Sequence, residues 1–319
     1  MKSNKYEIDM CNGSIMDKLV SFALPLMLSG ILQLMFNAVD IIVVGRFSGS
    51  EALAAVGSTT ALINVFTNLF IGISLGANVL AARFFAAGRK EEMSETVHTS
   101  ITLALISGIL MAFVGLVFSK GALELMGTPE DVIGLSTLYM RIYFMGMPFF
   151  MLYNYGAAIL RAVGDTKRPL YFLIIAGVIN AGLNMVLVIV FGLGVAGVGI
   201  ATVFSQMVSC VLVLTCLCRT EGSYKLSFSK LSMKGYYLKQ IFQVGIPAGI
   251  QSTVINFSNA LLQSSVNSFG STAMAGYTAA NNILGFLYVS INSVTQACMS
   301  FTSQNFGVGK YKRMDRVLI

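Results

Sequence analysis

A single carboxylate inside a long apolar stretch is the group most able to do chemistry in this sequence. Asp40 is the only formal charge in a run of about 27 residues between Lys18 and Arg46. At about 1.5 Å per residue this run exceeds a hydrocarbon layer of about 30 Å, so it predicts a membrane-spanning helix. An acid at that depth costs on the order of 3 kcal/mol on insertion, and such groups usually face a bundle interior or a watery cavity. Asp40 is therefore the first functional candidate, with a structural capping or pairing role as the alternative.

Two more polar side chains share the helix face of Asp40. Gln33, Asn37 and Asp40 follow one another at i, i+4 and i+7, while the other faces carry Leu, Ile, Met, Phe and Val. We therefore expect this face to look at protein or water and not at lipid.

Polar groups on two later apolar runs lie at a depth similar to that of Asp40. Asn180 and Asn184 are separated by one helical turn, and Thr202 follows a glycine-rich start of the next run. Counted from the outer ends of their runs, Asp40, Asn184 and Thr202 lie roughly 9 to 12 Å deep, with Asn180 one turn deeper. One carboxylate with amide and hydroxyl oxygens suits Na⁺, and a protonatable acid could equally carry H⁺. The alternative is that the amides and the hydroxyl only join helices.

Other polar side chains at helical spacing predict a central cavity that would hold a substrate. As a group they exceed what helix packing requires. The expected cavity residues are Gln33, Asn37, Asn64, Asn68, Asn154, Asn256, Asn259, Gln263, Asn292 and Gln296. His98, near the start of another run, is expected to be solvated.

The composition is that of an integral membrane protein. The chain has 319 residues, of which 55% are hydrophobic and 11% charged, and a mean hydropathy of +0.76. The net charge of +7 could suggest a nucleic-acid partner, but its distribution is better explained by membrane topology. No phosphate-binding loop, Ser/His/Asp set, HExxH motif or metal-type cysteine spacing occurs, so we expect neither an enzyme nor a cofactor beyond a coupling Na⁺ or H⁺.

Eight apolar runs are long enough to cross a bilayer. They cover residues 17–46, 51–86, 93–119, 129–161, 168–191, 194–218, 237–268 and 271–307. Pro25, Pro148 and Pro247 lie inside runs and predict kinks. Of the 21 cations, 18 lie on the side that holds the N-terminus. The positive-inside rule therefore predicts a multi-pass protein of the cell (plasma) membrane with a cytoplasmic N-terminus.

An internal repeat underlies these runs. Pro25 and Asn37 recur as Pro247 and Asn259 at an offset of 222, and further identities follow at an offset of 221. Six spans separate the copies, which predicts an all-α membrane fold made by parallel duplication of a six-helix bundle. We expect residues 1–221 to form a complete N-terminal lobe. Residues 222–319 would begin a C-terminal lobe that is cut off after two spans, in a complete chain of about 442 residues.

Three blocks of this sequence resemble the multidrug and toxic compound extrusion (MATE) transporters. They are PLMLSGILQLMFNAVDIIVVGRFSGSEALAAVG, NYGAAILRAVGDTKRP and GLGVAGVGIATVFSQ, in that order. The resemblance implies two six-helix lobes, alternating access, and export of organic cations against Na⁺ or H⁺. It also implies that Asp40, Asn180 and Thr202 form the cation site of the N-terminal lobe. Where some members of the family carry a second aspartate, this sequence has Asn184, which leaves one carboxylate to perform the coupling.

Two other functions compete with antiport. A flippase for lipids or lipid-linked oligosaccharides would belong to the same superfamily, but such proteins usually place more cations in the cavity, and here Arg141 is the main intramembrane cation. A channel is disfavoured because proline-kinked, duplicated lobes favour rocking over a fixed pore. We expect a monomer in the lipid bilayer, with a small organic cation as substrate and no nucleic-acid partner.

Overall fold

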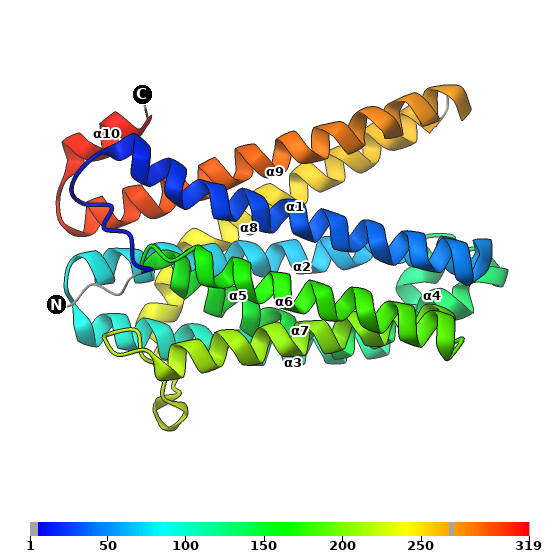
Figure 1. Cartoon of the computed structure of the whole chain (residues 1–319), viewed down its shortest axis with the longest axis horizontal. Helices are drawn as coiled ribbons and strands as arrows, with labels where there is room; N and C mark the ends of the chain where they lie inside the picture. The colour runs from blue at the N-terminus through cyan, green and yellow to red at the C-terminus, as the bar shows by residue number, and fades with distance from the viewer. Residues whose placement is uncertain (1–5, 268–270, 319) are drawn as a thin grey trace.

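Helices account for all regular structure in the part of the chain that the computed structural model describes, residues 6–267 and 271–318. Helices α1 to α7 form an elongated bundle, and the long hairpin of α8 and α9 crosses it at an angle (Figure 1). The bounds are α1 Ile15–Phe47, α2 Gly49–Ala86, α3 Lys90–Leu125, α4 Glu130–Met145, α5 Met147–Ala162, α6 Lys167–Asn184, η1 Met185–Val190, α7 Gly194–Arg219, η2 Phe228–Lys230, α8 Gly235–Asn267, α9 Ser271–Gly307 and α10 Tyr311–Leu318. The expected all-α architecture is confirmed.

Length and apolar composition explain why most of these segments are membrane helices. Among the described residues, five helical segments are long and apolar enough to cross a bilayer: α1, α2, α3, α7 and the continuous stretch Lys167–Val190. At about 1.5 Å per residue, α8 and α9 also have a crossing length. The short α10, beyond the last predicted run, was not expected.

The fourth predicted run, 129–161, is wrong as a single helix. It divides at Gly146 into α4 and α5, one residue before the N-terminal turn that contains Pro148. Proline has no N–H to donate to the preceding turn, so the α4 ladder ends there. The amides of Phe149 and Phe150 then bond to the Gly146 carbonyl at 3.0 and 3.1 Å, which starts α5. By contrast, the helices continue through Pro25 in α1 and Pro247 in α8.

The fifth predicted run changes its helical form directly after Asn184. The α-helix α6 ends at that residue and the π-helix η1 follows, with Phe191 N–H bonding to Val186 O at 3.0 Å. A π turn accommodates one residue more than an α turn, so the side chains beyond Asn184 are rotated relative to those before it. Nothing in the apolar sequence MVLVIV indicated this change.

The turns of the bundle gather at two ends. The terminal end holds Tyr6, Leu318 and the turns at 87–89, 163–166, 220–234 and 308–310, whereas the distal end holds those at Ser48, 126–129 and 191–193. Both marked termini lie at one end in Figure 1. At the terminal end the backbone of Ile8 lies close to Gly164. At the distal end the side chain of Ser48 lies close to Gly194.

Glycine allows α8 to lie against α2 with their backbones in contact. A Cβ on Gly72 would stand 2.3 Å from Cα of Gly249, and one on Gly76 would stand 2.2 Å from the carbonyl oxygen of Ile241. Such spacing is accessible only without side chains. The interface fixes the terminal half of α2 to α8, while at the distal end α8 and α9 diverge from the bundle (Figure 1).

Candidate functional site

Three helices bring the predicted cation-site residues together. Asn184 Nδ2 on α6 donates a hydrogen bond to Asp40 Oδ1 on α1 and a second one, of 3.1 Å, to Asn180 Oδ1. Thr202 Oγ1 on α7 lies 3.5 Å from Asp40 Oδ2 and donates at 3.0 Å to its own-helix carbonyl of Val198. The four side chains therefore form one contiguous polar cluster inside the bundle.

Three of the four side chains of the cluster are buried, Thr202 is partly buried, and the acid has no ion-pair partner among the described residues. Asp40 is 8% exposed, Asn180 5% and Asn184 0%. No Lys, Arg or His of the described chain forms an ion pair with Asp40. The other amide atom of Asn184, Oδ1, is buried and has no hydrogen-bond partner among the described residues. A buried acceptor without a donor is costly, and Asn184 Oδ1 is an oxygen that can accept from a proton donor or contact a cation.

A glycine on α6 lets the Asp40 helix approach closely enough for this contact. A Cβ on Gly177 would stand 1.7 Å from Cζ of Phe36, so the Phe36 ring fills the space above the glycine. Phe36 is one turn before Asp40, and Gly177 is one to two turns before Asn180 and Asn184. The aromatic contact therefore sets the distance and register of α1 on α6.

Two tyrosines border the cluster and were not predicted. The hydroxyls of Tyr139 and Tyr143 on α4 are close enough to interact electrostatically with Asp40. Their rings lie 6.2 Å apart, and Tyr139 is buried. Their spacing of one helical turn was a usable signal, since it places two hydroxyls on one face of α4.

None of the other predicted cavity residues whose side chains are described forms a hydrogen bond with this cluster. Gln33 and Asn37 are exposed on α1, Asn64 is exposed and Asn68 partly exposed on α2, and Asn259, Asn292 and Gln296 are exposed or partly exposed on α8 and α9. The side chain of Asn154 is satisfied within α5, where Nδ2 donates to Phe150 O at 2.8 Å. The side chains of Asn256 and Gln263 lie outside the described residues. Among the side chains that are described, none of this set bonds to Asp40.

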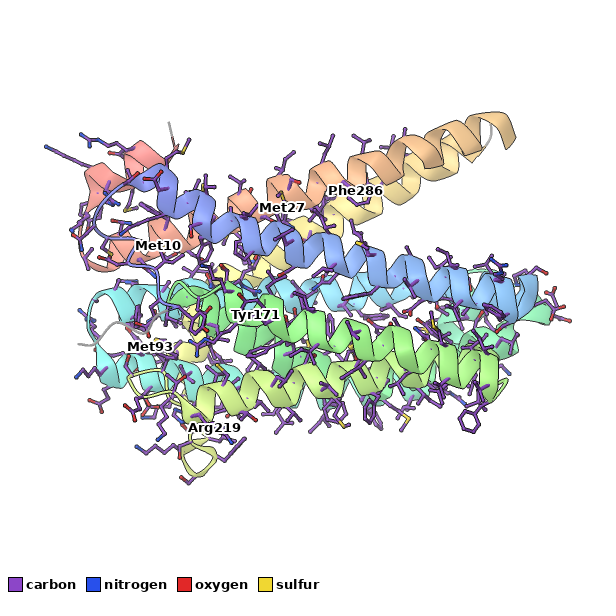
Figure 2. All side chains as sticks on the ribbon, in the orientation of Figure 1. Met10, Met27, Met93, Tyr171, Arg219 and Phe286 are labelled. Carbon is purple, nitrogen blue, oxygen red and sulfur yellow. The ribbon has the colours of Figure 1, made fainter. Side chains whose placement is uncertain are left out.

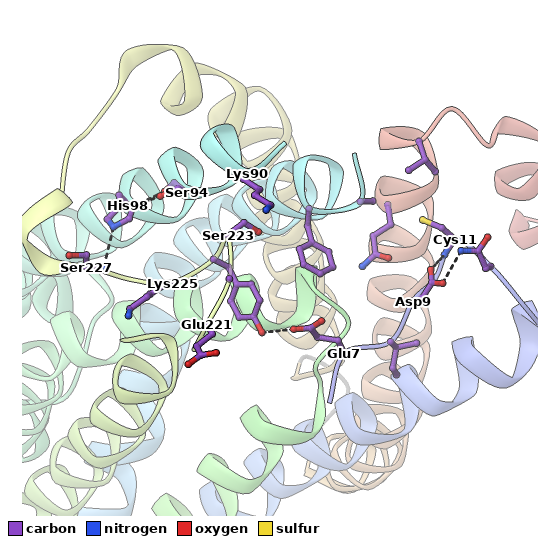
Figure 3. Close-up of a pocket in the computed structure, with 18 of the residues that line it drawn as sticks. Glu7, Asp9, Cys11, Lys90, Ser94, His98, Glu221, Ser223, Lys225 and Ser227 are labelled. Atoms are coloured by element: carbon purple, nitrogen blue, oxygen red, sulfur yellow. Dashed lines mark hydrogen bonds between the residues drawn. The ribbon is translucent and has the colours of Figure 1, made fainter. Parts of the chain in front are cut away.

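A large cavity lies at the terminal end. Its volume is about 1040 Å³, and Figure 3 shows Glu7, Asp9 and Cys11 on one side with Lys90, Ser94 and His98 on another. The expectation that His98 is solvated is wrong, because its ring is 2% exposed. Nδ1 contacts Ser94 O at 2.7 Å and Nε2 accepts from the amide of Ser227 at 3.1 Å, so the imidazole joins α3 to the 220–234 segment.

Within the residues that the structure describes, no group of three His, Cys, Asp or Glu side chains could hold a metal ion. The polar cluster combines one carboxylate with neutral amide and hydroxyl oxygens, which are donors of the type that hard cations prefer.

Asp40 is thus buried where α1, α6 and α7 meet, inside a bundle that contains helices long and apolar enough to cross a membrane. The MatE family model matches residues 25–186 and 247–319, and the chain belongs to the MatE family. The resemblance expected from the three sequence blocks is confirmed. Members of this family are transporters and not enzymes, in agreement with the absence of catalytic motifs.

Curated relatives cover nearly all of the chain. "Probable multidrug resistance protein YoeA" of Bacillus subtilis is 34% identical over 306 residues, which are 93% of this chain and 66% of that protein. "FAD transporter" of Shewanella oneidensis is 24% identical over 94% of this chain and 67% of its own length. The chain therefore spans about two thirds of the length of these relatives.

Solved structures share the fold. "Outward-facing conformation of a multidrug resistance MATE family transporter of the MOP superfamily" superposes with a TM-score of 0.91 at 24% identity, over 99% of this chain and 70% of that one. A MOP superfamily transporter from Pyrococcus furiosus, whose title reports a reversed polarity of the binding pocket, gives a TM-score of 0.92 at the same identity and coverage.

Proposed function

We propose that this protein exports organic cations or other drugs in exchange for Na⁺ or H⁺, and that Asp40, Asn180, Asn184 and Thr202 bind the coupling ion. The names of curated multidrug relatives support the substrate class. One observation supports the assignment of the coupling site. The buried Asp40 carboxylate accepts from an amide and a hydroxyl donor but has no cationic partner in the described chain. A charge held in this way is exchangeable, whereas a salt-bridged one would be structural.

The residues present fit either coupling ion. For Na⁺, the oxygens of Asp40, Asn180 and Thr202 lie together, and a half-turn of the Asn184 amide would replace its donor Nδ2 by the unpartnered Oδ1. For H⁺, the proton would sit on Asp40 and could be donated to that same oxygen. In both cases one positive charge enters and the acid is neutralised.

Neutralisation of the Asp40 charge would couple binding of the ion to movement of α1 relative to α6 and α7. With the carboxylate charged and unpaired, α1 is held to α6 and α7 through charge-assisted hydrogen bonds from Asn184 and Thr202. Binding of an ion weakens those bonds and relaxes the contact between α1 and its neighbours. The exchange of a substrate cation for the coupling ion then changes the same interface.

The organisation of the whole transporter is part of the proposal. We propose that residues 1–221 form one lobe and 222–319 begin a second by parallel duplication, since α2 packs on α8 as α1 packs on α9. The terminal end would face the cytoplasm of a plasma-membrane protein that acts as a monomer. Substrate would bind between the lobes, near the exposed polar faces of α1, α8 and α9.

A flippase receives no support from the site. A lipid-linked pyrophosphate requires buried cations, and the buried charge here is a carboxylate. Arg141, the main intramembrane cation, is exposed.

An ion-replacement assay tests the proposal. The purified full chain is reconstituted in proteoliposomes loaded with a fluorescent organic cation, and efflux is measured under an imposed Na⁺ gradient, an imposed proton gradient, or neither. Efflux that follows one of the two gradients supports antiport. Efflux that is equal under all three conditions would contradict it.

A further inference from the structure

The segment before α1 crosses the terminal end instead of leaving the molecule. Residues 6–13, here called the strap, connect the turn between α5 and α6 with the helices α9 and α10. Met10 marks its midpoint, between the start of α1 and α9 (Figure 2). The strap thus touches elements that lie on both sides of the terminal-end cavity.

On the bundle side the strap is held by backbone proximity, by a hydrogen bond of the Glu7 side chain and by a ring contact of Tyr6. A Cβ on Gly164 would stand 2.5 Å from the carbonyl oxygen of Ile8, so only glycine lets the strap pass there. Tyr224, in the 220–234 segment, donates from its hydroxyl to Glu7 Oε1 at 2.8 Å (Figure 3). The guanidinium of Arg168 lies 5.5 Å from the ring of Tyr6.

On the other side the strap is bound by α9 and α10. Asn305 Nδ2 and Arg313 Nε both donate to the carbonyl oxygen of Met10, each at 3.1 Å. Lys310 Nζ donates to Cys11 O at 2.9 Å and to Asn12 Oδ1 at 2.7 Å. These partners are about 300 positions from the strap in sequence, so they bond to it only in the folded chain.

An apolar anchor completes the attachment. Met10 is 1% exposed and packs in a small core with Phe22 of α1 and with Ala297 and Phe301 of α9. This core is separate from the main core of the bundle. The α9–α10 corner therefore depends on the strap for part of its packing.

The strap lines one side of the terminal-end cavity. The other lining residues come from the bundle and from the end of α9, which are the two parts that the strap connects. Phe85, Lys90 and His98 contribute from α2 and α3, Gln304 and Val308 contribute from the α9 end, and residues 221–230 form a third wall. Glu7, Asp9 and Cys11 of the strap line the same space (Figure 3). Widening this space means parting α9 and α10 from the bundle.

We propose that the strap is a releasable latch that holds the terminal end closed while α8 and α9 diverge from the bundle at the distal end. The bonds of Lys310 and Arg313 suit release, because both side chains reach solvent and water can replace them, whereas Tyr224 and Asn305 are buried. The need for this end to open rests on the proposed alternating-access function, whereas the test of the latch needs neither substrate nor ion.

The test measures access to the cavity. The reporter is Ser94→Cys on the cavity wall, in the full chain with its five native cysteines replaced by serine. The latch variant combines Tyr224→Phe, Lys310→Met and Arg313→Met. The matched control combines Tyr236→Phe, Lys312→Met and Arg316→Met, which remove the same chemical groups from exposed residues that make no bond to the strap among the described contacts.

The readout is the rate at which a charged maleimide modifies the reporter in detergent, with melting temperature as the folding control. The latch variant should react at least fivefold faster than the reporter alone, and the control variant within twofold of it. Equal rates for the latch and control variants would overturn the proposal. Should the triple variant fail to fold, Tyr224→Phe alone removes one hydroxyl and must raise the rate at least 1.5-fold, and an unchanged rate would again overturn the latch.

A second measurement locks the latch. In a protein that keeps Cys11 and has the other four cysteines of this chain replaced by serine, a short, cleavable bis-maleimide joins Cys11 to Lys310→Cys, the pair that the Lys310 hydrogen bond brings together. Locked protein should lose efflux, and cleavage of the linker should restore it; efflux that is unchanged by locking contradicts the latch. Efflux that is absent even before cross-linking counts against the proposed transport, and the reporter rates then decide the latch separately.

Discussion

The side-chain amide of Asn184 on α6 donates to the carboxylate of Asp40 on α1, across 144 positions of sequence, inside a bundle where both residues are buried. Asn184 Nδ2 is the donor and Asp40 Oδ1 the acceptor, while Asn184 Oδ1 has no hydrogen-bond partner among the described residues. That combination stabilises a charged Asp40 without neutralising it. The proposed coupling site rests on this relationship.

Asp40→Asn should abolish gradient-driven efflux, by at least tenfold, while the protein remains folded. The change keeps the shape of the side chain and removes the only buried charge of the cluster, and neutralising an unpaired buried carboxylate should not destabilise the fold. Efflux from proteoliposomes and the melting temperature are the two measurements. Asp17→Asn, which alters an exposed acid in the first turn of the same helix, is the control and should transport normally. Wild-type efflux by Asp40→Asn would make Asp40 structural.

Asn184→Asp should make stability depend on cations. Two carboxylates would then face each other where the wild type has an amide donor, so the variant needs either a bound cation or a proton to hold α6 against α1. At saturating Na⁺, about 100 times the Kd, binding contributes about 2.7 kcal/mol. The melting temperature should therefore rise by several degrees when Na⁺ replaces choline, and also on acidification in choline. If the melting temperature of the variant changes neither with Na⁺ nor with acidification, the result would be evidence against a cation site at Asp40.

Gly177→Ala should destabilise the protein by about 1 to 3 kcal/mol and weaken the Asp40 cluster, because the new methyl group overlaps the Phe36 ring. Chemical or thermal unfolding provides the measurement. Gly182→Ala on the same helix has nothing within 4 Å of its added Cβ and is the matched control. Combining Gly177→Ala with Phe36→Ala should recover part of the lost free energy of unfolding, because the smaller side chain leaves room for the new methyl group. If the effects of the two substitutions on the free energy of unfolding are strictly additive, the contact between Gly177 and Phe36 is not the cause of the destabilisation.

Cysteines placed at the two ends of the bundle should be labelled from opposite sides of the membrane. Ser229→Cys lies in the cation-rich segment at the terminal end and Ser50→Cys at the distal end, and both positions are exposed. With an impermeant maleimide on intact cells, Ser50→Cys should react and Ser229→Cys should react only after permeabilisation. The reverse pattern would invert the proposed topology.

The sequence by itself determined the helices and the chemistry they carry. Apolar runs of crossing length require helices because a backbone in lipid must satisfy its own hydrogen bonds, and this argument uses only local composition. The same is true of Asp40 as the one acid in its run, and of the shared depth of Asn184 and Thr202, which follows from a constant rise per residue.

Tertiary structure alone decided which atoms meet. The sequence predicted a bend at Pro148, but the place where the run divides, Gly146, depends on how α3 and α7 pack against α4 and α5. On α3, for example, a Cβ on Gly108 would stand 2.5 Å from Cα of Pro148. The π turn after Asn184 and the approach of Tyr139 to Asp40 likewise depend on packing between helices. The strap is the extreme case. It has no periodic pattern to read, and its partners lie about 300 residues away, so only the closed chain brings Met10 to Asn305 and Arg313.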